Sequence, residues 1–77
     1  MNLGNTLTDI SIIAESHYGH DTVKFVGIKY STAGNFFTAK LKMNGENSIY
    51  ENGKTPEEAA KKLKKRLLKI IKRYLIV

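Results

Sequence analysis

The sequence predicts a single small α+β domain, residues 1–77: a two-layer sandwich in which a three-stranded antiparallel meander packs on a long C-terminal helix. Residues 55–76 show the two-faced pattern of an amphipathic helix, and residues 22–31 and 35–43 alternate as half-buried strands do. An apolar stripe as wide as that of the helix must be covered, and the inward faces of the strands can cover it. With a further helical pattern at residues 6–18, the expected order is α-β-β-β-α.

The N-terminal region is the ambiguous element. Residues 1–5 look like a disordered lead-in, and residues 6–18 favour a helix that stops at Gly19. A strand is the alternative, because the β-branched Ile10 and Ile12 alternate with polar residues. The candidates for the N-cap are Thr6, Thr8 and Asp9. The apolar side of the helix would consist of Ile10, Ile13, Ala14 and His17.

Three strands are expected between the helices. In residues 22–31, one face would hold Val26, Ile28 and Tyr30, and the other Val23 and Phe25. In residues 35–43, the inward set is Phe37, Ala39, Leu41 and Met43, and the outward set is Phe36, Thr38, Lys40 and Lys42. Asn44-Gly45 is a strong hairpin signal, because both residues tolerate positive φ. A short third strand is expected at residues 47–51, after which Asn52-Gly53 would turn the chain into the helix.

The start of the C-terminal helix carries a complete capping signal. Thr55 stands at the N-cap, Pro56 at the first helical position and Glu58 three residues after the cap. The Thr55 hydroxyl can accept a hydrogen bond from the first turn, and the Glu58 carboxylate can reach back to the N–H of the cap residue. Proline is tolerated there because its missing N–H would have no helical partner.

The same helix separates into an apolar and a basic face when it is plotted at 100° per residue. The apolar arc contains Ala59, Ala60, Leu63, Leu67, Leu68, Ile70, Ile71, Tyr74 and Leu75. The opposite face contains Lys61, Lys62, Lys65, Arg66, Lys69, Lys72 and Arg73. Lys64 alone falls on the apolar arc, where its methylene groups can lie along the core while its ammonium group reaches water.

Composition and charge exclude several classes of protein. The net charge of +6 is concentrated between Lys61 and Arg73, a segment that holds eight of the thirteen Lys and Arg and no acid, whereas the rest of the chain has five lysines against seven acids. Such a one-sided field attracts polyanions, although a charged face can also serve solubility alone. The chain has no cysteine, no membrane-spanning apolar run and no signal-peptide pattern. We therefore expect a soluble cytoplasmic protein that does not act at a membrane.

Few residues could carry catalysis. His17 and His20, followed by Asp21, have no distant His or Cys to complete a metal site. A glycine-rich phosphate loop and a nucleophile–base set are also absent from the sequence. We expect no enzyme, no cofactor, no metal and no small-molecule substrate.

Two surfaces could bind a partner: the basic helix face and the outer face of the sheet. The residues expected to contact nucleic acid are Lys54, Lys61, Lys62, Lys65, Arg66, Lys69, Lys40, Lys42 and Phe36, with Lys29 and Tyr50 as further members of the sheet face. Lysines neutralise phosphates, and exposed aromatic rings can stack on unpaired bases. The alternative for Phe36 is packing against the N-terminal segment. For Lys40 and Lys42 the alternative is a charged face that blocks aggregation.

The segment from Phe37 to Leu67 resembles two known families. The run Phe37-Thr38-Ala39-Lys40-Leu41-Lys42-Met43-Asn44-Gly45 is similar to the alternating strand and glycine turn of the double-stranded-RNA-binding domain. Gly53-Lys54-Thr55-Pro56-Glu57-Glu58-Ala59-Ala60-Lys61 stands where that family begins its second helix, although it has Pro-Glu-Glu where the family places consecutive lysines. Gly53 to Ala59 is also similar to HicB-like antitoxin domains. Integrase arm-binding domains share the layout.

These resemblances imply an α-β-β-β-α fold and two functions. The leading hypothesis is a non-catalytic nucleic-acid-binding or nucleic-acid-associated module, with duplex RNA or DNA as the partner of the basic helix face. The alternative is a protein-interaction module, antitoxin-like or a phage-type regulator, that binds a protein partner or forms a homodimer. The apolar tail Tyr74-Leu75-Ile76-Val77 motivates this alternative.

Overall fold

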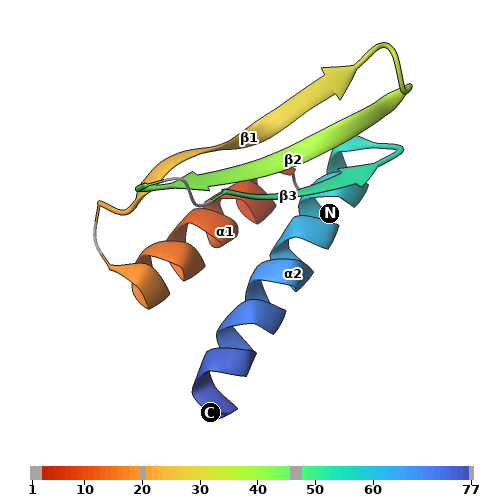
Figure 1. Ribbon diagram of the computed structural model, residues 1–77. Helices are drawn as coiled ribbons and strands as arrows, with labels where there is room; N and C mark the ends of the chain where they lie inside the picture. Colours follow the sequence, from red (N-terminus) through yellow and green to blue (C-terminus); the bar gives the residue numbers. More distant parts are fainter. Residues whose placement is uncertain (1–2, 20, 46–47, 77) are drawn as a thin grey trace.

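The described part of the chain folds into two helices and one antiparallel sheet, as expected. The computed structural model describes residues 3–19, 21–45 and 48–76, and for residues 74–76 it describes the backbone alone. The elements are α1 (Leu3–Tyr18), β1 (Val23–Ser31), β2 (Phe36–Met43), β3 (Ser48–Gly53) and α2 (Pro56–Ile76) (Figure 1). The sheet order is β1-β2-β3, so the meander with its central strand β2 is confirmed.

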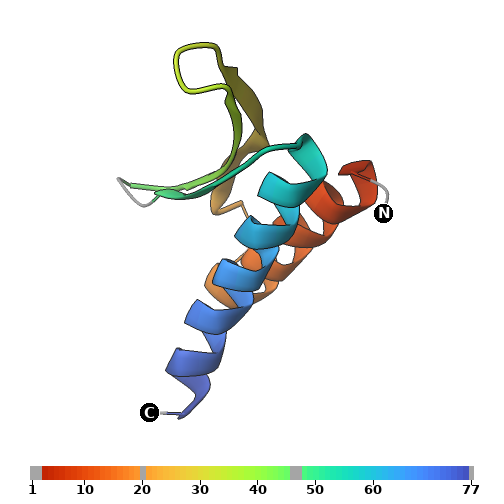
Figure 2. The same ribbon diagram turned by 90° about the vertical axis from the view of Figure 1, so that its right-hand side faces the viewer.

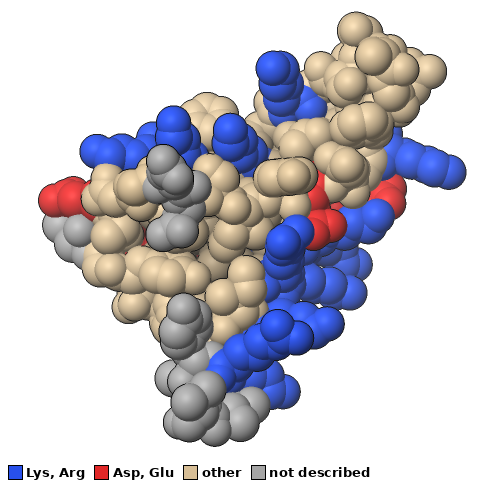
Figure 3. Space-filling model, in the orientation of Figure 1, with Lys and Arg blue, Asp and Glu red and all other residues tan. Residues whose placement is uncertain are grey.

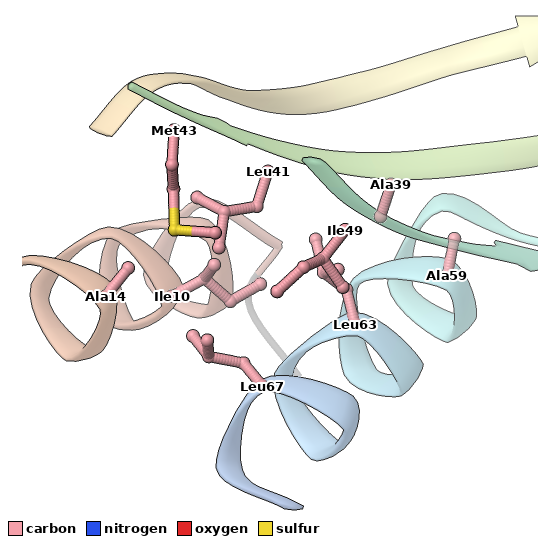
Figure 4. Close-up of a cluster of buried hydrophobic side chains, with 9 residues drawn as sticks. All are labelled: Ile10, Ala14, Ala39, Leu41, Met43, Ile49, Ala59, Leu63 and Leu67. Atoms are coloured by element: carbon pink, nitrogen blue, oxygen red, sulfur yellow. The ribbon is translucent and has the colours of Figure 1, made fainter. Parts of the chain in front are cut away.

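Both helices lie on one face of the sheet, which makes two layers (Figures 1 and 2). Ile10, Leu41, Leu63 and Leu67 are the largest fully buried side chains between these layers. Around them, the buried cluster is completed by Ala14, Ala39, Met43, Ile49 and Ala59 (Figure 4). Because successive strand residues point to opposite faces, burial of these β2 residues turns their lysine neighbours to the outer face of the sheet.

Helix α1 begins earlier than predicted. It starts at Leu3, so residues 3–5 are helical and the expected disordered lead-in is wrong for them; residues 1 and 2 lie outside the described residues. Thr6 is buried in this first part of the helix and Leu7 packs against the core, which gives the early turns a reason to form. The predicted caps Thr6, Thr8 and Asp9 are therefore interior residues.

Helix α1 ends at Tyr18, directly before Gly19, as the sequence predicts. The Gly19 N–H donates to the Glu15 carbonyl oxygen at 2.9 Å, and Gly19 has φ +114°, which an L-residue rarely adopts. This residue therefore closes the last turn of the helix. The helix favoured for residues 6–18 is confirmed, and the alternative of a strand is wrong.

An irregularity in β1 changes which side chains face the core. The pairing shifts between Val23, opposite Met43, and Phe25, opposite Lys42. The extra residue of such a bulge reverses the alternation. Val23 consequently packs against the core together with Val26 and Ile28, and the prediction that it shares a face with Phe25 is wrong.

Strand β3 ends two residues later than predicted. Asn52 and Gly53 continue the pairing with β2, so the expected turn at these residues is wrong, and the chain bends at residues 54 and 55 instead. At the end of the strand, a β-carbon on Gly53 would stand 2.5 Å from the Ala59 nitrogen, so glycine allows the strand to meet the helix. Residue 47, the predicted first residue of this strand, lies outside the described residues.

The capping signal of α2 is formed with one difference. The Glu58 N–H donates to the Thr55 hydroxyl oxygen at 3.0 Å, as predicted. The Glu58 carboxylate accepts from the Lys54 N–H at 3.2 Å rather than from the N–H of Thr55. The bend at residues 54 and 55 brings that earlier N–H over the first turn of the helix.

Two residues on the predicted apolar arc of α2 lie at its margin beside α1. The Lys64 ammonium group pairs with the Asp9 carboxylate of α1 at 3.1 Å, so this lysine links the two helices. Leu68 is 44% exposed, and the prediction that it is covered is wrong. Both helices contribute to the groove beside it, which is lined by Ile12, Ile13, Ser16, His17, Leu68 and Ile71.

Candidate nucleic-acid interface

The outer face of α2 gathers exposed cations along the length of the helix. We define this face by Lys61, Lys62, Lys65, Arg66, Lys69, Lys72 and Arg73, all of which are exposed. Figure 3 shows basic side chains along α2 and a second group over the sheet. Five of the predicted contact residues thus lie together on one helix face.

Ion pairs divide the cations of this face into two groups. The Lys62 ammonium lies 3.2 Å from the Glu58 carboxylate, and the Arg66 guanidinium lies 2.8 Å from the Glu51 carboxylate. Arg66 also donates to the Tyr50 carbonyl oxygen at 3.2 Å, which fastens the edge of β3 to α2. Among the described residues, no acid lies within ion-pair distance of the other five cations of this face: Lys61, Lys65, Lys69, Lys72 and Arg73.

The charge of Glu58 is stabilised by its place at the helix start. The hydrogen bond from Lys62 lowers the pKa of this carboxyl group most, followed by the bond from the Lys54 N–H, and the positive charges of the two lysines act in the same direction. The lowered pKa means that Glu58 stays ionised and keeps part of the Lys62 charge engaged. Lys54, another predicted contact residue, is exposed at this start of the helix and away from the middle of the α2 face.

The outer face of the sheet carries a second basic surface. It is hollowed by about 580 Å³, and the sheet curves so that this face is concave (Figure 2). We call this hollow the sheet platform; it is lined by Phe25, Gly27, Lys29, Thr38, Lys40, Lys42 and Tyr50. All seven of these lining residues are neutral or basic, so the described part of the platform carries no acid.

Aromatic rings border the lysines of the sheet platform. Phe25 on β1 is 52% exposed and Tyr50 on β3 is 57% exposed. The sequence had suggested Tyr50 as a member of this face but gave Phe25 no role. The signal that could have found it is the glycine two residues later on the same face, which leaves room for a ring.

Phe36, the predicted aromatic contact, does not line the platform. Its ring lies over Gly34 in the preceding turn, at the end of the β1–β2 hairpin. The structure also separates the predicted lysines. Lys40 and Lys42 lie on the face of the sheet that points away from the helices. The α2 cations lie on the exposed side of the helix layer, where Arg66 reaches the edge of β3.

Metal sites and membrane-spanning helices would point to other classes of protein. Among the described residues, no group of three or more His, Asp or Glu side chains could hold a metal ion. Within the same part of the chain, neither helix is both long enough and apolar enough to cross a membrane. Comparison with protein-family models, with curated proteins and with solved structures finds no match to the chain. The resemblances to RNA-binding, HicB-like and integrase domains therefore stay interpretations.

Proposed function

We propose that this protein is a non-catalytic nucleic-acid-binding module that holds phosphates on the outer face of α2. The observation that carries the proposal is the set of exposed lysines on that face whose charge no described acid neutralises: Lys61, Lys65, Lys69 and Lys72. Exposed lysines attract a polyanion strongly when their charge is not already compensated within the protein.

The spacing of these lysines supports a linear polyanion as the ligand. Lys61, Lys65 and Lys69 follow one another at four-residue intervals, which places them about 6 Å apart along the helix axis. A stripe of charges extends along α2 for about 16 Å if Lys72 is included. Lysines supply point charges and no base recognition, so this face fits a duplex backbone and reads no sequence.

Fluorescence anisotropy with short duplex RNA and duplex DNA tests the proposal. Each lysine that contacts a phosphate contributes about one to the slope of log affinity against log salt. We expect the double variant Lys61→Gln, Lys65→Gln to lower that slope by about two and to weaken binding about tenfold at low salt. The matched control is Lys24→Gln, Lys64→Gln, which removes the same charge outside the α2 face.

Equal losses in the two double variants would show that net charge alone acts and would overturn the assignment to α2. Absence of duplex binding by the unchanged protein at low salt would overturn the function itself. A preference for RNA or for DNA identifies the duplex that this module binds.

A protein-interaction module that self-associates is the second candidate, and the groove between α1 and α2 favours it. Ile12 is 57% exposed and Leu68 is 44% exposed, side by side at the margin of the core. Covering them in a dimer would remove apolar surface from water. Light scattering across a concentration series tests this candidate: a dimer that Leu68→Lys dissociates supports it, whereas a strict monomer opposes it.

A further inference from the structure

The middle of the sheet platform is one row of side chains across the three strands. Gly27 of β1 pairs with Lys40 of β2, and Lys40 pairs with Tyr50 of β3. The tip of the Phe25 ring lies over Gly27, because its Cζ atom is 2.7 Å from the place where a β-carbon would stand. The row therefore reads aromatic ring, lysine, aromatic ring.

The two rings are held in place by different means. Phe25 occupies space that any side chain at position 27 would fill, so the glycine determines where the ring rests. Tyr50 has its backbone carbonyl oxygen bound by Arg66 of α2, which fixes the edge strand that carries the ring. Both rings are nonetheless more than half exposed, which leaves them accessible to a ligand.

The separation of the rings favours unpaired bases over a duplex. Two strand spacings place the two ends of the row about 10 Å apart. Stacked bases in a duplex follow each other at about 3.4 Å, so neighbouring bases of a duplex cannot occupy both rings. A single strand can splay its bases apart and place one on each ring.

The charges of the platform complement the backbone that would link those bases. Lys40 lies between the rings, and Lys29 and Lys42 line the same hollow. Because the described lining residues include no acid, a phosphate placed among them meets positive and neutral groups. A peptide of acidic residues alone would satisfy the lysines, but it has no ring to stack on Phe25 and Tyr50 as a base does.

From these observations we propose that the sheet platform is a binding site for single-stranded nucleic acid, in which Phe25 and Tyr50 each stack on one unpaired base and Lys40 contacts the phosphate backbone between them. This rests on the proposed function, that the protein binds nucleic acid. It adds a second site on the opposite layer of the sandwich, with a different ligand from that of α2.

The test compares a fluorescent ten-nucleotide oligouridine with an abasic strand of the same length and charge. We expect the intact strand to bind at least about tenfold more tightly, because the abasic strand keeps the phosphates and loses the stacking. Phe25→Leu and Tyr50→Leu should each remove most of that advantage, since leucine keeps apolar area without a planar ring. Tyr50→Phe keeps a ring and should bind as the unchanged protein does.

The matched control is Tyr30→Leu. Tyr30 is also an exposed aromatic residue, but it lies on the other face of the sheet, where its ring contacts Phe37 at 4.8 Å between centroids. Affinity for the strand should be unchanged in this variant. Thermal unfolding of each variant shows that the compared proteins are folded.

A second measurement needs no variant. A strand that carries 5-iodouracil, bound to the unchanged protein and irradiated, should form cross-links at Phe25 or Tyr50, identified by mass spectrometry. Cross-links confined to α2 would overturn the proposal.

The outcomes separate this proposal from the proposed function. Equal affinity for the intact and abasic strands would overturn base stacking while duplex binding by α2 stands. Failure to bind any nucleic acid at low salt would overturn both. Competition by a hexaglutamate peptide that also depends on Phe25 and Tyr50 would overturn the single-strand assignment, because the platform would then be a docking site for acidic protein segments.

Discussion

The outer face of α2 and the sheet platform are both basic, but they differ in what surrounds their charges. Seven cations lie on the helix face, where Glu58 and Glu51 engage two of them. Three lysines lie on the platform beside two exposed rings, and no acid is among the lining residues that the structure describes. The number of charges thus says how strongly a surface attracts a polyanion, whereas its neighbouring groups decide whether it can distinguish one polyanion from another.

The largest effect should come from the core that the two surfaces share. Leu41 is fully buried between Lys40 and Lys42, so Leu41→Ala removes packing beneath the platform. We expect the free energy of unfolding to fall by about 2–5 kcal/mol. Urea denaturation measures this change, and both binding activities should be lost at the same denaturant concentration. Loss of one activity before the other would mean that the two surfaces unfold separately.

The second-largest effect should be a difference in how strongly binding at the two surfaces depends on salt. With four unpaired lysines, duplex binding to α2 should weaken about 100-fold between 50 and 200 mM salt. With three lysines and a smaller slope for single strands, platform binding should weaken about 20-fold over the same range. Anisotropy titrations at several salt concentrations give both slopes. Identical slopes would indicate that one surface binds both ligands.

A change at Gly27 should act on the platform alone. In Gly27→Ala the new β-carbon would stand 2.7 Å from Phe25 Cζ, so the ring must move away. We expect affinity for the single strand to fall a few-fold, about the effect of weakening one stacked base. Duplex binding should be unchanged, and stability should be equal or slightly higher, because glycine weakens strands. Reduced duplex affinity would contradict the separation of the surfaces.

The smallest effect should come from Glu58. Because its pKa is lowered in the folded state, its ionised form stabilises the fold above pH 4.5, and this contribution is lost as pH falls through the lowered pKa. Glu58→Gln should therefore flatten the acid limb of a thermal-unfolding profile against pH. The variant also releases Lys62, so duplex affinity should rise by less than about fivefold, with no change for the single strand. An unchanged acid limb would mean that the capping contact does not form in solution.

Sequence patterns predicted the fold and part of the site. The alternation from Phe37 to Met43 predicted both faces of β2 correctly, because every second residue there is apolar and buried or half-buried. The α2 lysines were placed on one face for the equivalent helical reason. Phe25, which we propose as a contact residue, was missed, since its place on the platform depends on Gly27 beneath it and on Tyr50 two strands away.

The sequence by itself determined the features that depend on near neighbours: the cap and the two faces of α2, the stop at Gly19 and the alternation of β2. Tertiary structure decided the features that join distant residues. It shifted the register at Val23, carried the α1 start back to Leu3, and paired Arg66 with Glu51. The physical reason is that periodicity and capping act within a few residues, whereas strand register and ion pairs between elements are set by how the whole core packs.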